Sequence, residues 1–116
     1  MKKTALIIDD LPEYREIIKT CLIKHGYHII EAGTGEEGIA LYKKNKTVID
    51  LITMDFQMPG LNGVETAQKI WAITPGVTII GISDSPQAMR RCCEQKRVNL
   101  TIIAKQDLPE ALDYRV

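Results

Sequence analysis

The chain has 116 residues, which is enough for one hydrophobic core, and we interpret residues 1–116 as a single domain. Its 15 basic and 15 acidic side chains give a formal net charge of zero, so bulk charge favours neither nucleic acid nor an anionic membrane as a partner. Three cysteines without metal-binding spacing, and a first apolar run too short for a signal peptide or a bilayer span, are typical of a cytoplasmic protein with reduced thiols.

The first half of the chain alternates short apolar runs with helical patterns. Residues 6–8 predict a buried strand that ends at two acidic residues. Apolar side chains then recur at helical spacing over 12–25, where a proline suits the first turn and Gly26 suits the stop. Residues 27–31, rich in aromatic and β-branched side chains, predict a second strand, and a helix is expected over 34–44.

The second half repeats this alternation, with loops marked by proline, glycine and asparagine. The predicted elements are a strand over 48–54, a helix over 62–71, a strand over 77–82, a loop and helix start over 83–86 followed by a polar helix to about 97, a strand over 100–104 and a last helix that begins at 107 and is cut short by the chain end. We interpret two short basic runs, one near 43–46 and one over 90–97, as solvated surface. We also interpret His25 and His28 as structural, since neither has a metal-ligand partner in the sequence pattern.

Strand and helix therefore alternate five times, and the strands are almost continuously apolar. This pattern predicts an α/β fold in which a parallel sheet is covered on both faces by helices. Right-handed crossovers favour an open, doubly wound sheet, whose binding site lies at the carboxyl ends of the strands. With the strand order 2-1-3-4-5, strands one and three are neighbours at the point where the winding reverses.

Acidic residues end both of these strands. Asp9 and Asp10 follow the first strand, and Asp55 follows the third. Three carboxylates in one crevice repel one another and raise one another's pKa unless a cation lies between them. A hard divalent ion with oxygen ligands resolves this repulsion, and Mg²⁺ commonly combines a few carboxylates with water and phosphate oxygen.

Two further polar residues are expected on the same edge of the sheet. Ser83 ends the fourth strand and Lys105 follows the fifth. Alone, each of these residues is typical of a loop or a surface, and an acidic pair is typical of a helix cap. Together, a hydroxyl and an ammonium beside a metal-bound carboxylate favour phosphoryl transfer, with Asp55 as the nucleophile that forms an acyl phosphate.

The sequence resembles the receiver domains of bacterial two-component response regulators over nearly its whole length. The matching segments are Leu6-Ile7-Ile8-Asp9-Asp10, Met54-Asp55-Phe56-Gln57-Met58-Pro59-Gly60-Leu61-Asn62-Gly63, and the single residues Ser83 and Lys105. The run Asp-x-x-Met-Pro-Gly-x-Asn-Gly is the specific part of the match. The resemblance implies the flavodoxin-like receiver fold and a signalling switch that is not a true enzyme beyond its own phosphotransfer and dephosphorylation.

The resemblance implies a role for each site residue. Asp55 would be the phosphoacceptor, supplied by a sensor histidine kinase. Asp10 and Asp55 would ligate Mg²⁺ directly, Asp9 through water, and the backbone carbonyl of Gln57 would complete the protein ligands. The phosphorylated chain would then act on a downstream output domain or protein, through the fourth helix, fifth strand and fifth helix.

The remaining implied roles belong to the rim of the site. Ser83 would bond the phosphoryl group and move in response to it, and Lys105 would pair first with Asp55 and then with phosphoryl oxygen. Gln57 and Ser85 stand where side chains tune the attack of hydrolytic water. The last helix is short for the family, which suits either a stand-alone module or the truncated end of a longer regulator.

Three residues depart from the family pattern. Asp84 follows Ser83 where a small residue is usual, and it adds repulsion unless its side chain points away. Gln106 replaces a proline that follows a cis peptide bond. Because a cis bond before a non-proline residue costs about 3 kcal/mol, we expect a trans bond and a shifted Lys105 loop, or else a strained one. Ile102 replaces an aromatic side chain that swings inward on activation, a motion that the stiff isoleucine does not reproduce.

These departures motivate an alternative function, a receiver-like adaptor that binds partners without being phosphorylated. A phosphatase with an aspartyl nucleophile usually carries a second acid two residues further on, where this chain has Gln57. A flavin-binding carrier shares the fold class, but its phosphate would meet Asp9 and Asp10 in the first loop. The sequence therefore favours a receiver over both of these classes.

Overall fold

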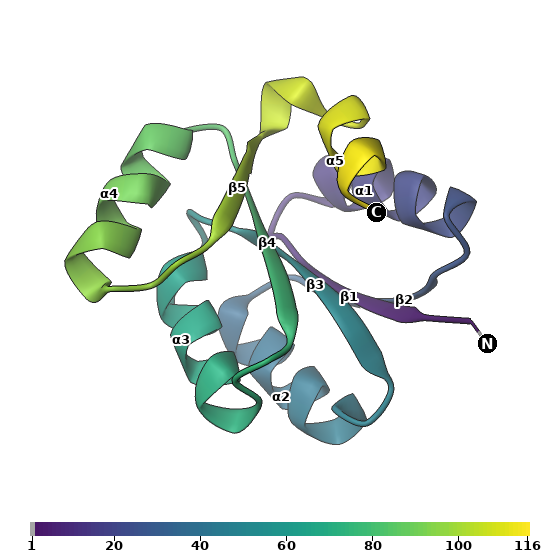
Figure 1. The fold of residues 1–116 in the computed structure, drawn as a ribbon, viewed down its shortest axis with the longest axis horizontal. Coiled ribbons are helices and arrows are strands. Elements are labelled where there is room, and N and C mark those ends of the chain that lie inside the picture. Colours follow the sequence, from purple (N-terminus) through teal and green to yellow (C-terminus); the bar gives the residue numbers. More distant parts are fainter. Residues whose placement is uncertain (1) are drawn as a thin grey trace.

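The computed structural model describes residues 2–116, in which five strands alternate with helices (Figure 1). The elements are β1 (Thr4–Ile8), α1 (Pro12–Lys24), β2 (His28–Ala32), α2 (Gly35–Asn45), β3 (Ile49–Asp55), α3 (Gly63–Ile73), β4 (Thr78–Ser83), α4 (Pro86–Lys96), β5 (Thr101–Ala104), a 3-10 turn (Lys105–Asp107) and α5 (Glu110–Arg115). Every predicted strand and helix is present, and only the start of the last helix differs noticeably, since a separate turn precedes it.

The strands form one parallel sheet in the order β2-β1-β3-β4-β5, which confirms the predicted doubly wound α/β fold. Helices α1 and α5 lie on one face of the sheet, and α2, α3 and α4 lie on the other (Figure 1). The cores match this division: Leu22 of α1 and Leu112 of α5 share one cluster, whereas Tyr42 of α2 and Ile70 of α3 share another. The central strands β1, β3 and β4 are buried on both faces, which explains why they are almost continuously apolar, whereas the edge strands β2 and β5 are more exposed.

The loop after β3 is fixed by the start of α3. The Asn62 side chain accepts a hydrogen bond from the Glu65 backbone N–H, and the Glu65 side chain accepts one from the Asn62 backbone N–H. This capping box satisfies two donors at the helix start that would otherwise be unpaired. It therefore holds the segment that runs from the end of the central strand into α3.

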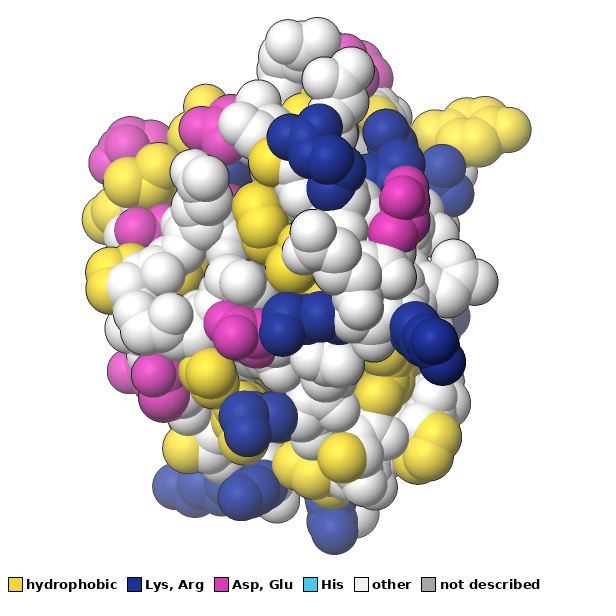
Figure 2. All heavy atoms as spheres, turned by 90° about the vertical axis from the view of Figure 1, so that its left-hand side faces the viewer, with side chains coloured by type: hydrophobic (Ala, Val, Ile, Leu, Met, Phe, Trp, Pro, Cys, Tyr) yellow, Lys and Arg dark blue, Asp and Glu magenta, His cyan; other side chains and the backbone are white. Residues whose placement is uncertain are grey.

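Basic side chains are spread over the surface. The side that faces left in Figure 1, where α3 and α4 lie, shows Lys and Arg side chains interspersed with apolar and acidic ones (Figure 2). All members of the basic run over 90–97 are exposed, as expected of solvated surface. Over residues 2–116, no helix is both long and apolar enough to cross a bilayer.

Candidate functional site

The acidic residues that end β1 and β3 lie side by side. Ile8 of β1 is paired with Met54 of β3 in the parallel ladder. Asp9 and Asp55 are the next residues on the two chain segments, so they lie beside each other. Carboxylate oxygens of Asp9, Asp10 and Asp55 lie within 4.8 Å of one another. Asp9 and Asp55 are only 1% and 4% exposed, and Asp10 is half-buried. The sheet therefore brings the three predicted carboxylates into one cluster.

Backbone donors hold two of these carboxylates. Asp9 Oδ1 accepts a hydrogen bond of 2.9 Å from the Leu11 N–H, and Asp55 Oδ1 accepts one of 2.9 Å from the Phe56 N–H. The Arg15 guanidinium donates to the Asp9 backbone carbonyl at 2.7 Å and so joins α1 to the end of β1. Both acids thus have fixed orientations before any ligand is added.

A glycine allows α3 to approach the site. Gly63 is the first residue of α3, and its N–H donates to the Phe56 carbonyl at 2.7 Å. A methyl group at Gly63 would overlap the backbone carbonyl oxygen of Asp55. The close approach of the two backbone segments therefore requires a residue without a side chain.

The Lys105 ammonium, which follows the edge strand β5, contacts the acids. Its Nζ lies 3.1 Å from Asp55 Oδ1 and 3.4 Å from Asp9 Oδ2, and also 4.1 Å from the centre of the Tyr14 ring. The side chain is 3% exposed. Burial lowers the pKa of Lys105, but the attraction of Asp55 and Asp9 outweighs that effect and the net pKa is raised. Lys105 is therefore a charged, buried partner of both acids.

One ammonium does not neutralise this cluster. Burial, and then the charge of Asp9, raise the pKa of Asp55 to about 7, against the opposing effect of Lys105. Burial also raises the pKa of Asp9, although the Leu11 N–H and Lys105 act in the opposite direction. The carboxylates are thus held in a place that disfavours their negative charge unless a further positive charge is supplied.

A magnesium ion fits the donor set. All the clustered ligand atoms are carboxylate oxygens, which Mg²⁺ prefers. Asp9 Oδ2 is buried and has no hydrogen-bond partner, although it makes the ion-pair contact with Lys105. A buried oxygen without a hydrogen bond is uncommon in folded proteins, and a cation beside it would satisfy it.

Ser83 and Gln57 lie at the rim, as their sequence positions indicate. Ser83 is the last residue of β4 and is 1% exposed, and Asp55 is paired with the preceding residue Ile82. The Ser83 hydroxyl oxygen accepts a hydrogen bond of 2.9 Å from the Ser85 N–H. Gln57 lies in the loop after β3 with an exposed side chain. The roles of both residues stay predictions.

The three departures from the family pattern are accommodated in different ways. Asp84 is exposed and is not one of the clustered carboxylates. The only cis peptide bond between residues 2 and 116 precedes Pro109, so the bond between Lys105 and Gln106 is trans, as expected. Lys105 nevertheless contacts Asp55. Ile102 is half-buried and packs at the edge of the core cluster that contains Phe56.

The sequence patterns do not indicate some of the contacts found here. Tyr14 stacks under Lys105 although it was expected only as an apolar position of the first helix. The interpretation of His25 as a residue without metal-ligand partners is wrong, because Cys21 and Asp113 lie beside it. Cys21 and His25 stand four residues apart on one helix face, a spacing that was readable in the sequence, but Asp113 lies near the other end of the chain.

Comparisons with known proteins point to one family. A family model described as response regulator receiver domain matches residues 5–113. The chemotaxis protein CheY of Thermotoga maritima is 38% identical over 81 residues, which cover 69% of this chain and 66% of that protein. The autoinducer 1 sensor kinase/phosphatase LuxN of Vibrio campbellii is 35% identical over 80 residues, which cover 69% of this chain and only 9% of the much longer LuxN.

Solved structures with the same fold include two chemotaxis proteins. A chain in the CheX–CheY–BeF3–Mg²⁺ complex from Borrelia burgdorferi is 27% identical with a TM-score of 0.83, and the match covers 97% of this chain and 84% of that chain. Vibrio cholerae chemotaxis protein CheY4 is 25% identical with a TM-score of 0.84, and the match covers 99% and 96% of the two chains.

Proposed function

The chain belongs to the response regulator receiver domain family, the signalling switches of two-component systems, and on that premise we propose that Asp55 is its phosphoacceptor. The observation that carries the proposal is the buried Lys105 ammonium, which lies 3.1 Å from Asp55 Oδ1 and also contacts Asp9. Hydrophobic packing alone does not explain a buried, charged lysine that contacts two acids at the ends of different strands.

In the proposed reaction, a carboxylate oxygen of Asp55 attacks the phosphorus of a phosphohistidine on a sensor histidine kinase. A phosphorus–oxygen bond forms, the phosphorus–nitrogen bond breaks, and the imidazole leaves with its bonding electron pair. Asp55 Oδ1 is already bonded to Phe56 and Lys105, so we assign the attack to its second oxygen.

Charge neutralisation and positioning assist this step. Asp9, Asp10, Asp55 and the backbone carbonyl of Gln57 would hold Mg²⁺, which would neutralise charge on the transferring group. Lys105 would transfer its contact from Asp55 to a phosphoryl oxygen. Ser83, whose hydroxyl oxygen accepts from the Ser85 N–H, would donate its hydroxyl hydrogen to another phosphoryl oxygen.

The consequence of phosphorylation would be a change in how this domain contacts a downstream output domain or protein. We place the whole exchange in the cytoplasm, where histidine kinase domains encounter their receivers. No direct contact with nucleic acid or membrane is part of the proposal, in keeping with the balanced surface charge.

Incubation with acetyl phosphate and Mg²⁺, followed by intact-mass measurement, tests this proposal. We expect one phosphoryl adduct on the natural chain, none in excess chelator and none on Asp55→Asn. Asp84→Asn is the matched control, because Asp84 is also an acid at a strand end but is exposed and outside the cluster. It should label as the natural chain does, and an adduct that persists on Asp55→Asn would overturn the assignment.

The receiver-like adaptor is the second candidate, and Ile102 is the observation that favours it. This half-buried aliphatic side chain stands where the resembled family places a swinging aromatic ring. The same experiment separates the two functions. A folded natural chain that takes up no phosphoryl group in the presence of Mg²⁺ would support the adaptor.

A further inference from the structure

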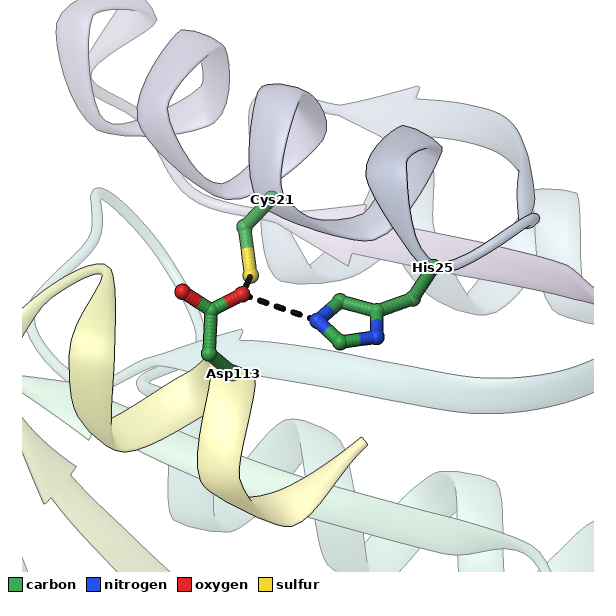
Figure 3. A group of neighbouring side chains, drawn as sticks. All are labelled: Cys21, His25 and Asp113. Atoms are coloured by element: carbon green, nitrogen blue, oxygen red, sulfur yellow. Dashed lines mark hydrogen bonds and ion pairs between the residues drawn. The ribbon is translucent and has the colours of Figure 1, made fainter.

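A second cluster of polar side chains lies between α1 and α5, and Figure 3 shows its members, Cys21, His25 and Asp113. His25 Nε2 lies 2.8 Å from Asp113 Oδ1, and the Cys21 thiol donates to the same oxygen at 3.1 Å. One ligand atom from each residue lies within 4.8 Å of the other two. The cluster lies toward the end of α1, whereas the acidic cluster precedes its start, and α1 is about 20 Å long.

The three side chains converge on one point from two helices. Cys21 and His25 are four residues apart and therefore share a face of α1, and Asp113 reaches them from α5 (Figure 3). Sulfur, imidazole nitrogen and carboxylate oxygen are together the ligand types that proteins use for zinc. In a tetrahedral zinc site the ligand atoms are separated by about 3.3–3.5 Å. The two contacts of Asp113 Oδ1, at 2.8 Å and 3.1 Å, would therefore open by up to about half an ångström, and Cys21 and His25 lie within 4.8 Å of each other.

A catalytic role for this cluster does not fit its geometry. A cysteine nucleophile needs a base in contact with its sulfur, but His25 contacts Asp113 and no hydrogen bond joins it to Cys21. Burial, and then Asp113, raise the pKa of the Cys21 thiol to about 12, so a bound metal ion would have to displace the thiol proton. A metal ion is the ligand that uses all three groups at once.

The cluster is also open to a small ion. Cys21 is buried, but the side chains of His25 and Asp113 are each 30% exposed. A shallow cavity of about 390 Å³ between α1 and Pro109 reaches Cys21. Lys24 Nζ lies 3.6 Å from the other oxygen, Asp113 Oδ2, and is well exposed, so the lysine does not contact Oδ1, the oxygen that faces Cys21 and His25. Water from the open side would complete the coordination.

We propose that Cys21, His25 and Asp113 form a binding site for a zinc-class divalent transition ion that cross-links α1 to α5. Helix α5 has only six residues, too few for stability on its own, so its position depends on contacts with the rest of the chain. An ion bound by both helices would add a second attachment besides the packing of Leu112. The site is independent of the phosphoryl chemistry proposed at Asp55.

Titration of the natural chain with Co²⁺ in excess Mg²⁺ tests the site. The excess Mg²⁺ would compete with Co²⁺ for the acidic cluster, and cobalt bound to a thiolate gives a sulfur-to-metal charge-transfer absorption that carboxylates do not give. We expect this absorption on the natural chain and its loss in Cys21→Ala. Cys93→Ala is the matched control, since Cys93 is also a buried thiol but has no His or Asp ligand beside it, and it should keep the absorption.

Variants of His25 and Asp113 test the site even if Cys21→Ala fails to fold. His25→Gln and Asp113→Asn change partly exposed residues and should each weaken Co²⁺ binding by at least about tenfold, while His28→Gln, an exposed histidine on β2, should not. Zn²⁺ should raise the Tm of the natural chain and of His28→Gln, but not that of His25→Gln. Absence of the absorption on the natural chain, or its persistence in Cys21→Ala, would overturn the proposal and leave the cluster as a hydrogen-bond network.

Discussion

The acidic cluster stands on the ends of strands, whereas the cluster of Cys21, His25 and Asp113 stands on two helices. The carboxyl ends of the strands are fixed by parallel ladders, which pair Ile8 of β1 with Met54 of β3 and Asp55 of β3 with Ile82 of β4. The helices meet through a few side chains, and the sulfur and imidazole contact a single carboxylate oxygen. Groups on a sheet edge are therefore positioned by the backbone, while groups between helices are positioned largely by one another.

The two clusters also shift the pKa of their carboxyl groups in opposite directions. Burial raises the pKa of Asp55 to about 7, so its ionised form is disfavoured in the folded chain. Hydrogen bonds from His25 and Cys21 lower the pKa of Asp113, so its ionised form is favoured. The first cluster is arranged for a ligand that brings positive charge, and the second already supplies donors to its carboxylate.

The largest expected effect comes from changing the backbone contact under the acidic cluster. Gly63→Ala forces a methyl group against the Asp55 carbonyl, and we expect a loss of about 3 kcal/mol of unfolding free energy together with loss of phosphoryl uptake. Chemical denaturation and intact-mass labelling measure the two effects. In Gly76→Ala, the control, the methyl group meets no atom within 4 Å, so stability should change by less than about 0.5 kcal/mol. Equal effects at the two glycines would contradict this account.

Replacing Asp55 or Asp113 by asparagine should change the free energy of unfolding by a smaller amount, and the sign should differ between the two clusters. In chelator, Asp55→Asn should raise the free energy of unfolding by about 1–2 kcal/mol, because it removes a buried charge and leaves Lys105 paired with Asp9. Asp113→Asn should lower the free energy of unfolding under the same conditions, because it removes a carboxylate that the fold stabilises.

The dependence on pH follows from the direction of each shift. The folded pKa of Asp55 is raised, so its ionisation penalty begins above its unfolded value of 3.8 and is complete above about 7. The gain from Asp55→Asn should therefore grow over that interval, and Mg²⁺ should reverse it by binding the natural chain. The folded pKa of Asp113 is lowered, so its contribution is present above 3.8 and is lost as pH falls further. Equilibrium denaturation across this range checks both signs, and a gain from Asp55→Asn that did not vary with pH would refute the first.

The smallest effect is expected at Tyr14, whose ring lies under the Lys105 ammonium. Tyr14→Leu keeps an apolar side chain but removes the cation–π contact, and should lower the unfolding free energy by about 0.5–1 kcal/mol. Tyr114→Leu is the control, since Tyr114 is 90% exposed and should be neutral. A loss much larger than this in Tyr14→Leu would mean that the ring, rather than the carboxylates, holds Lys105 in place.

The acidic cluster could be predicted from the sequence because its members share a local signature. Asp9, Asp55, Ser83 and Lys105 each stand at the end of an apolar run, and parallel strands deliver their carboxyl ends to one edge. The contact between Cys21 and Asp113 has no such signature, because 92 positions separate the residues and two helices must first pack. Position in a sheet is readable from periodicity, whereas the pairing of helix faces depends on the finished core.

The last helix begins later than its sequence pattern predicts, because a proline restricts the residue before it. A helix was predicted from residue 107, but Lys105–Asp107 form a 3-10 turn and α5 begins at Glu110. Leu108 precedes Pro109, and its backbone is extended, with ψ of 148°. Proline disfavours the helical conformation in the residue before it, so the helix could not run through this position.

The path of the Lys105 side chain has one more consequence. Lys105 follows β5, at the outer edge of the sheet, yet its ammonium contacts Asp55, which ends β3, and Asp9, which follows β1. Neighbouring strands are about 4.8 Å apart, and these ion pairs therefore connect the segment after β5 to the ends of strands that β5 does not adjoin. Any anion that competes for the ammonium therefore pulls on the short border strand β5, whose single ladder to β4 makes it the most easily displaced part of that edge.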